Sequence, residues 1–219
     1  MRKAVAVFLF AFLVLGKTDG SLAQGASSAK DLEQAVEEYD TGLRDLRAGR
    51  HAEAARKFQS ALARLKNHPE LELGRGLALL RAGDTKGAFE ALQPVVTSNN
   101  GPLASSALAL QGRIRFEEGD LSAAESLLMK ARKRDEGNQL ATRLLGLLYA
   151  KQKRFGLAIP LLKQTTSRNP LDFDATHLLG VSYLGTQQWR SAKPHLLKAH
   201  QMEPEDLAVL CNLASALLG

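Results

Sequence analysis

The sequence predicts an all-α fold, a solenoid of stacked antiparallel helix pairs, and this prediction depends on two observations. First, five glycines recur at intervals of 34, 36, 34 and 34 residues: Gly42, Gly76, Gly112, Gly146 and Gly180. Second, an alanine follows each glycine by twelve residues, and a large apolar residue follows each alanine by four. A repeat of this length, with three residue types held in register, is typical of helical hairpins that bury one another's apolar faces.

The overall composition agrees with a folded helical protein. The 219 residues are 45% apolar and 24% charged, with a formal net charge of +6, which excludes wholesale disorder. Aromatic residues make up only 5%, so the core must depend mainly on leucine, alanine and valine. The single cysteine, Cys211, excludes a disulfide framework and a cysteine-only zinc site within one chain.

The N-terminus has the pattern of a cleaved secretory signal, residues 1–23. Two basic residues precede 13 apolar ones, a run too short to span a bilayer core of about 30 Å. Small residues follow at 21–23, so we expect cleavage after Ala23 or, as an alternative, after Gly25. An uncleaved interfacial anchor is the other interpretation. A cleaved signal predicts a periplasmic or extracellular protein, most simply bacterial, whose mature chain has no transmembrane span.

After a small, polar and flexible lead-in at 24–34, the periodicity predicts five repeats and a remainder. The repeats are expected at 35–68, 69–102, 105–138, 139–172 and 173–206, and residues 207–219 as the first helix of an incomplete sixth. In each repeat, the glycine and the alanine are expected where the two helices cross. The large residue one turn after the alanine fills the space beside that crossing. The alanines and large residues are Ala54, Ala88, Ala124, Ala158 and Ala192, with Phe58, Leu92, Leu128, Leu162 and Leu196.

The connections between the helices have their own signals. Gly49, Gly83 and Gly119 stand where a first helix ends, a position that often requires positive φ. Lys153 and Gln187 replace that glycine in the last two repeats, where Phe155 and Trp189 are expected to plug the turn.

Two departures from the repeat lie at the insertion and at the end of the sequence. Two extra residues, 103 and 104, follow the turn-rich stretch 99–102, which predicts a longer loop and a small bend. Residues 207–219 contain only two polar side chains, Asn212 and Ser215, whereas a terminal repeat normally has a polar outer face.

The fourth and fifth repeats resemble the tetratricopeptide repeat. The matching residues are Leu145-Gly146-x-x-Tyr149, Ala158 and Pro170, then Leu179-Gly180-x-x-Tyr183, Ala192, Ala199 and Pro204. The first three repeats lack the leucine, tyrosine and proline of this pattern. The resemblance covers residues 35–219 and implies a right-handed superhelical solenoid that binds proteins and catalyses nothing.

The resemblance also implies that the first helices line a concave, partner-binding groove. Its predicted contact residues are Tyr39, Arg47, Leu77, Arg81, Arg113, Phe116, Arg143, Leu147, Lys151 and His177. Further positions in the same columns are Leu43, Leu73, Ala109, Val181 and Leu184. Apolar residues beside a line of cations suit a peptide or helix with apolar anchors and an acidic group. The leucines alternatively belong to the core between neighbouring helices. The asparagines of a carboxylate clamp are missing from these helices before Asn212.

Catalytic, metal and cofactor sites are not indicated. The five histidines fall in different repeats or at spacings that do not suit a zinc helix, and the glycines follow the helical repeat rather than a phosphate loop. Ten cations against two acids in residues 130–168 suit an acidic protein or anionic lipid, or merely form a solvated face. Nucleic acid is not expected, because a secretory signal is predicted and no aromatic residues interleave these cations.

The sequence therefore predicts a non-catalytic interaction scaffold of the cell envelope that binds a peptide or helix in its groove. The alternative is a docking or regulatory portion of a larger secretion, envelope-assembly or enzyme complex. In that case the apolar helix at 207–219 is a candidate for self-association.

Overall fold

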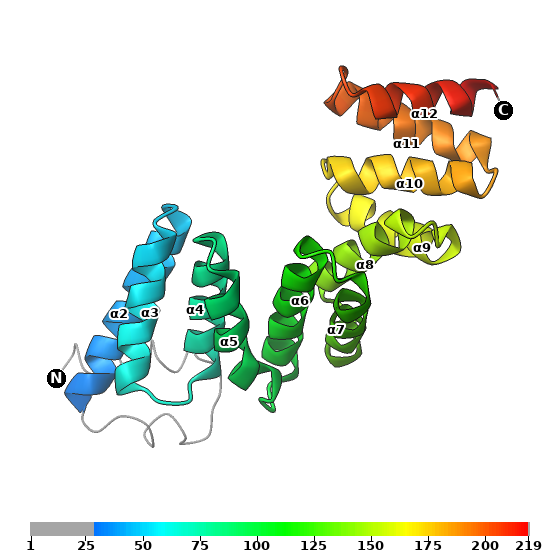
Figure 1. The fold of residues 1–219 in the computed structure, drawn as a ribbon. Helices are drawn as coiled ribbons and strands as arrows, with labels where there is room; N and C mark the ends of the chain where they lie inside the picture. Colours follow the sequence, from blue (N-terminus) through cyan, green and yellow to red (C-terminus); the bar gives the residue numbers. More distant parts are fainter. Residues whose placement is uncertain (1–28, 219) are drawn as a thin grey trace. The chain divides into compact units, whose positions relative to one another are not determined.

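The computed structural model describes residues 29–218, and the predicted all-helical hairpin fold is confirmed over that range (Figure 1). The helices are α2 (Ala29–Arg47), α3 (His51–Arg64), α4 (Pro69–Arg81), α5 (Thr85–Val96), α6 (Gly101–Glu117), α7 (Leu121–Arg134), α8 (Gln139–Lys151), α9 (Phe155–Arg168), α10 (Phe173–Gly185), α11 (Trp189–Met202) and α12 (Leu207–Leu218). The predicted signal, residues 1–23, lies outside the described residues.

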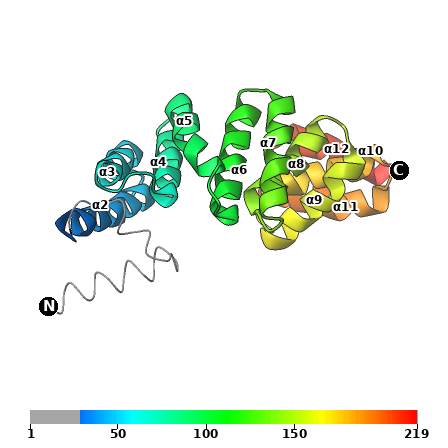
Figure 2. The same cartoon turned by 90° about the horizontal axis from the view of Figure 1, so that it is seen from below.

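The described residues divide into two compact units, one up to Leu110 and one from Gln111 on, called here the N-terminal and the C-terminal unit. In the N-terminal unit, α2 packs on α3, α3 on α4 and α4 on α5. In the C-terminal unit, each helix from α7 to α12 packs on the next. The two helices of a repeat run side by side in both views, as α2 with α3 and α10 with α11 do (Figure 2).

The glycine column lies at the helix crossings, as predicted. A Cβ added at Gly42 would fall 3.0 Å from the Phe58 ring, and one added at Gly180 would fall 2.6 Å from Leu196 Cγ. Gly76, Gly112 and Gly146 meet Leu92, Leu128 and Leu162 at 2.7 to 2.9 Å in the same way. The large residue of each repeat thus lies directly on its glycine. All five large residues and all five alanines of the columns are fully buried.

The turn between the two helices of a repeat requires positive φ in every repeat. Gly49, Gly83 and Gly119 have φ of 77°, 90° and 83°. Lys153 and Gln187, which stand at the same position, have φ of 59° and 58°. The predicted role of this position is therefore confirmed, and in two repeats a residue with a side chain adopts the left-handed region.

Phe155 does more than fill its own turn. Its ring lies against the backbone of Gly185 at the end of α10, so closely that a Cβ at Gly185 would clash with it. This aromatic ring therefore joins the fourth repeat to the fifth.

The predicted longer loop at the insertion is wrong. Residues 97–100 form a four-residue connection, as long as those at 65–68 and 169–172, and the extra residues extend α6. The Asn100 carboxamide oxygen accepts a hydrogen bond from the Leu103 backbone N–H at 3.1 Å and so caps α6. Pro102 lies in the first turn, where its missing N–H costs no helical hydrogen bond.

The flexible lead-in predicted for residues 24–34 is too long, because residues 29–34 already belong to α2. This segment consists mostly of good helix formers such as alanine, leucine, lysine and glutamate. Leu32 packs on the core, and the side chain of Gln34 accepts a hydrogen bond from Arg64 Nε at 3.2 Å. Contacts with α3 thus stabilise this first part of α2.

Candidate functional site

In the N-terminal unit, the predicted groove residues fall into two groups. Arg47 and Arg81 are exposed at the C-terminal ends of α2 and α4. Tyr39 and Leu77 are partly buried and pack against the core, with the Tyr39 ring centroid 5.9 Å from that of Phe58. Burial, together with the nearby Glu70 carboxylate, raises the pKa of Tyr39. Only the two cations are fully presented to solvent.

In the C-terminal unit, the structure brings two predicted residues from neighbouring repeats together. Lys151, exposed at the end of α8, has its Nζ 4.9 Å from the ring centroid of Phe116 on α6. This distance is within the range of a cation–π interaction. Arg113, one turn before Phe116, forms an exposed ion pair with Glu117 at 2.7 Å. These four side chains form a surface of one aromatic ring, two cations and one carboxylate.

The prediction that Leu147 contacts a partner requires correction. Leu147 is only 5% exposed, and its neighbours Leu144 to Ala150 on α8 are all buried. The reason is that α8 packs against α7, α9 and α10. The side of α8 that the repeat pattern assigns to the groove therefore also faces other helices. Ala109 is likewise fully buried. Both belong to the core, which is the alternative that the sequence left open for the leucines.

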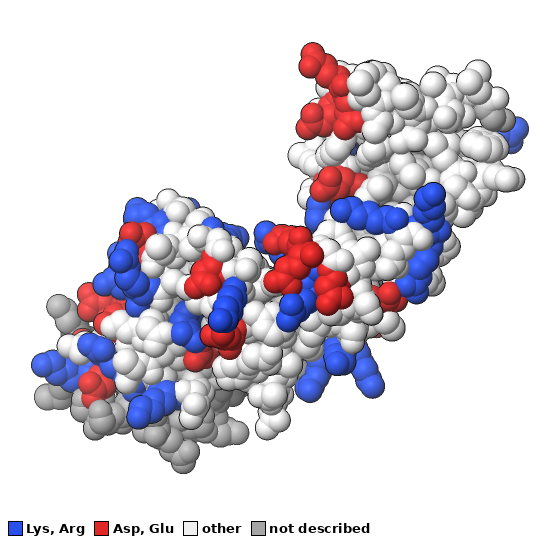
Figure 3. Space-filling model, in the orientation of Figure 1, with Lys and Arg blue, Asp and Glu red and all other residues white. Residues whose placement is uncertain are grey.

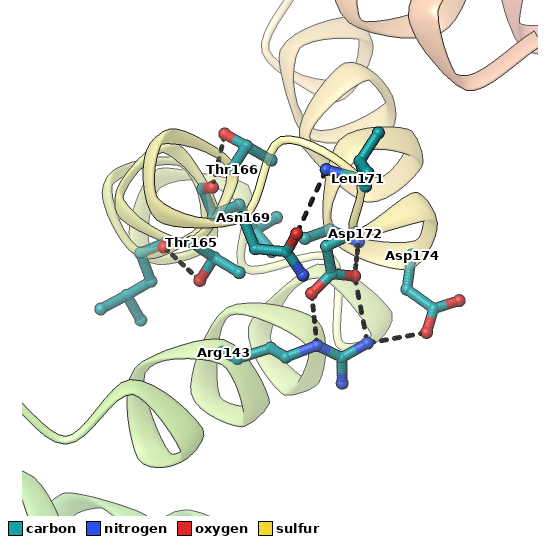
Figure 4. A network of polar contacts seen from close by, with 10 residues as sticks. Arg143, Thr165, Thr166, Asn169, Leu171, Asp172 and Asp174 are labelled. Atoms are coloured by element: carbon teal, nitrogen blue, oxygen red, sulfur yellow. Dashed lines mark hydrogen bonds and ion pairs between the residues drawn. The ribbon is translucent and has the colours of Figure 1, made fainter. Parts of the chain in front are cut away.

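Arg143 is committed to a network inside the protein (Figure 4). Its Nε lies 2.5 Å from Asp172 Oδ2, and its Nη2 lies 3.1 Å from Asp172 Oδ1 and 2.9 Å from Asp174 Oδ2. Asp172 also accepts a hydrogen bond from the Ala175 N–H at 3.1 Å, which caps α10. The hydrogen bonds to Asp172 raise the pKa of Arg143. The guanidinium thus links α8 to α10 and is already balanced by two carboxylates.

A small hollow of about 160 Å³ lies beside this network, between α8, α9 and the loop before α10. Its lining includes Gln139, Leu140, Gln164 and Arg168. Pockets for cofactors and drug-sized ligands usually enclose about 300–1,000 Å³. This hollow is therefore suited to a single side chain or a few water molecules and not to a cofactor.

His177, another predicted contact residue, bonds within the protein. Its Nε2 lies 3.0 Å from the Asn212 side-chain nitrogen, and its ring centroid lies 5.8 Å from that of Phe173. Half-burial lowers the pKa of His177, although Asp206 and Asp174 oppose that shift. The neutral imidazole can accept the Asn212 hydrogen bond, so the pair joins α10 to α12.

A third polar cluster, which the sequence analysis missed, joins the third and fourth repeats. Arg154 Nη1 lies 2.7 Å from Glu125 Oε2, and the Tyr149 hydroxyl lies 3.1 Å from Glu125 Oε1. The guanidinium of Arg154 also lies over the Tyr149 ring, 4.4 Å from its centroid. The hydrogen bond from Arg154 lowers the pKa of Glu125. Tyr149 belongs to the repeat pattern and could have indicated this cluster from the sequence. Its partner Glu125, however, lies 24 residues away in the sequence.

The described residues contain no group of three or more histidine, cysteine or acidic side chains placed to hold a metal ion. Within residues 29–218, no helix has both the length and the apolar character needed to cross a bilayer.

Comparison with known proteins agrees with this architecture. The profile of the family described as "Tetratricopeptide repeat" matches residues 39–101, 73–139, 109–173 and 143–189, which together span most of the chain. A search of curated proteins found no match.

Several solved structures have a similar fold. MamA is 24% identical, with 79% of this chain and 93% of that one covered and a TM-score of 0.61. YrrB, whose structure is titled "a TPR protein with an unusual peptide-binding site", is 19% identical, with coverages of 82% and 91% and a TM-score of 0.59. TTC0263, a thermophilic TPR protein of Thermus thermophilus, is 23% identical, with coverages of 84% and 100% and a TM-score of 0.55. At these identities the likeness shows the fold alone.

Proposed function

Because the chain belongs to the tetratricopeptide repeat family, we propose that it is a non-catalytic scaffold that binds a protein or peptide partner on its first helices. The observation that supports this most directly is the stacking of Lys151 over Phe116 in the C-terminal unit. Two neighbouring repeats present a cation and an aromatic ring together, and Lys151 is exposed to solvent. The peptide-binding site named for YrrB is a precedent within the same fold.

The chemistry of this surface defines the partner. Lys151 forms no ion pair in the described part of the chain, so it can accept a carboxylate. The partly exposed ring of Phe116 lies beside it and is apolar. Arg113 can exchange Glu117 for a partner carboxylate, because exposed ion pairs contribute little net free energy. We therefore expect a peptide or helix that carries an acidic group next to an apolar side chain.

The proposed compartment is the cell envelope, and it is inferred from the signal pattern at residues 1–23. A protein exported in this way would meet its partner outside the cytoplasm. The alternative, a docking portion of a larger secretion or enzyme complex, uses the same surface in the same manner.

Charge reversal at Lys151 tests the binding surface. The full chain, purified from the envelope fraction with its partners, is expected to begin at residue 24 or 26. The Lys151→Glu variant should bind the captured partner about tenfold more weakly by calorimetry, because the attraction between Lys151 and a partner carboxylate is replaced by repulsion. Phe116→Ala should weaken binding as well, without changing its salt dependence.

The matched control is Lys153→Glu, the same charge change at an exposed residue two positions further along. Equal losses in both lysine variants would show that only net charge matters. Unchanged affinity in Lys151→Glu and Phe116→Ala would remove this surface from the binding site.

A second candidate function, self-association, is favoured by the exposed apolar face of α12. Leu207 is 75% exposed, Leu217 57% and Leu218 90%. Leu210, Cys211 and Ala214 are exposed on the same face, since helix positions three and four apart lie together. Only Val209 and Ala216 of α12 are buried, and the helix carries no charged residue. We propose a second copy of this chain as the occupant of this face.

Charge complementarity favours an antiparallel pairing of the two copies. Glu203, Glu205 and Asp206 precede α12, while Arg190 and Lys193 lie in the first turns of α11. Because α11 packs against α12 and the two are joined by a short loop, those basic residues lie near the end of α12. An antiparallel pair therefore places the acidic end of one copy against the basic end of the other.

Light scattering after size exclusion tests this pairing. The full chain is expected to be a dimer, and Leu210→Asp with Leu217→Asp should give a monomer with unchanged helix content. Ala208→Asp, outside the apolar face on the same helix, should remain dimeric. A monomeric wild-type chain would exclude the pairing.

A further inference from the structure

The second helices of the C-terminal unit, α7, α9 and α11, carry charged side chains of almost one sign. They carry nine lysines and arginines, four on α7, two on α9 and three on α11, against a single acidic residue, Glu125. The nine are Lys130, Arg132, Lys133, Arg134, Lys163, Arg168, Arg190, Lys193 and Lys198. We call these residues, with the exposed apolar side chains among them, the basic face. In Figure 3, lysine and arginine side chains protrude below the lower end of α7, and others lie along α9.

The charge of the basic face is not balanced within the described part of the chain. Glu125 already pairs with Arg154, which lies in the turn before α9. None of the nine cations forms an ion pair with any other residue described, and Arg168 donates only to the backbone oxygen of Gly137, at 3.2 Å. Most of the nine are exposed. The positive charge of the basic face is therefore available to an anionic binding partner.

Apolar side chains protrude from the same face. Met129, Lys163 and Leu197 occupy one position in three successive repeats, 34 residues apart. Met129 is 54% exposed and Leu197 44%, and Leu157 on α9 is 48% exposed. The repeat thus places aliphatic side chains on both sides of a lysine across three helices.

This mixture fits an anionic lipid surface better than an acidic protein. Protein interfaces are enriched in aromatic residues and depleted in lysine, whereas five of the nine cations here are lysines. The two aromatic residues of these helices, Phe155 and Trp189, are both partly buried. Attraction to anionic lipid adds up over many cations without precise geometry, and short aliphatic side chains can enter the headgroup region.

We propose that the basic face docks the C-terminal unit on a membrane surface that contains anionic lipid. The lysines and arginines supply the attraction, and Met129, Leu157 and Leu197 supply a component that salt does not screen. The first helices are not part of this face, so Lys151 and Phe116 remain available to a protein partner. The chain would then bring that partner to the membrane.

Sedimentation with lipid vesicles tests the proposal, using the full chain freed of its signal. The chain is expected to bind vesicles of phosphatidylcholine with phosphatidylglycerol and not vesicles of phosphatidylcholine alone. Lys130→Glu with Lys163→Glu should weaken binding about tenfold or more, since each cation near the surface contributes to the attraction. Met129→Ser with Leu197→Ser should reduce the fraction that stays bound at high salt.

The matched control is Lys57→Glu with Lys86→Glu, the same change at exposed lysines on the second helices of the N-terminal unit. It should leave vesicle binding unchanged, and far-UV circular dichroism should show that all variants fold. Equal losses in both double variants, or equal binding to neutral vesicles, would overturn the proposal. So would loss of the captured protein partner in Lys130→Glu with Lys163→Glu, because the face would then bind an acidic protein. If only the Lys151→Glu test fails, the proposed protein-binding surface is wrong, but the vesicle-binding result for the basic face still holds.

Discussion

Replacing Gly146 with valine is expected to lower the free energy of unfolding by about 1–3 kcal/mol. A Cβ at this position would lie 2.9 Å from Leu162 Cδ2, 3.1 Å from Leu162 Cγ and 3.3 Å from Leu161 Cβ. Leu162 is fully buried and Leu161 is 8% exposed, so neither side chain can move away freely. Valine adds two more methyl groups to a crossing that has no room for one carbon. Urea denaturation followed by far-UV circular dichroism measures the loss.

Gly156→Val is the matched control for this prediction. Gly156 lies in the first turn of α9, and a Cβ there would meet no atom within 4 Å. Both variants replace a helical glycine by valine, and only the one at Gly146 meets the side chains of the crossing. If both variants have the same free energy of unfolding, the close contact between α8 and α9 is not what requires glycine.

Asp172→Ala is expected to lower the free energy of unfolding by about 2–3 kcal/mol. The variant loses the cap of α10 and leaves Arg143, whose side chain is 32% exposed, with Asp174 as its one remaining ion-pair partner among the described residues. The Asp172 side chain is 6% exposed, so water replaces it poorly. The partial exposure of Arg143 keeps the cost below that of a fully buried unpaired charge.

Two controls divide this loss between the cap and the ion pair. Asp120→Ala removes an equivalent cap, since Asp120 accepts from the Ala123 N–H at 3.0 Å at an exposed site, and should cost about 1 kcal/mol. Asp172→Asn retains a capping oxygen and removes only the charge. If Asp172→Ala costs no more than Asp120→Ala, the pairing with Arg143 contributes nothing measurable to stability.

The hairpins and their crossings could be predicted because the physical requirement is local and recurrent. Gly76 and Leu92 stand in fixed register because a closely packed crossing excludes any side chain on one helix and needs a large one on the other. Gly83 and Lys153 occupy the same position of the repeat, at the end of a first helix, and both have positive φ. These features need only the spacing of residues within one repeat.

The candidate site was harder to predict because its side chains depend on partners in other repeats. Arg143 meets Asp172 across 29 residues of sequence, and His177 meets Asn212 across 35. Leu147 was assigned to a surface that neighbouring helices cover. At Asn100 the sequence signal was ambiguous, since asparagine, glycine and proline together favour either a turn or the start of a capped helix.

The left-handed residues in the last two interhelical turns also affect the unfolded chain. Glycine would relieve backbone strain at Lys153 and Gln187, but it would also give the denatured ensemble more conformations to lose on folding. A residue with a Cβ has the backbone strain of positive φ in the folded state, but it also has fewer backbone conformations in the unfolded state. The fourth and fifth repeats therefore reach the same turn with a smaller loss of conformational entropy than the first three.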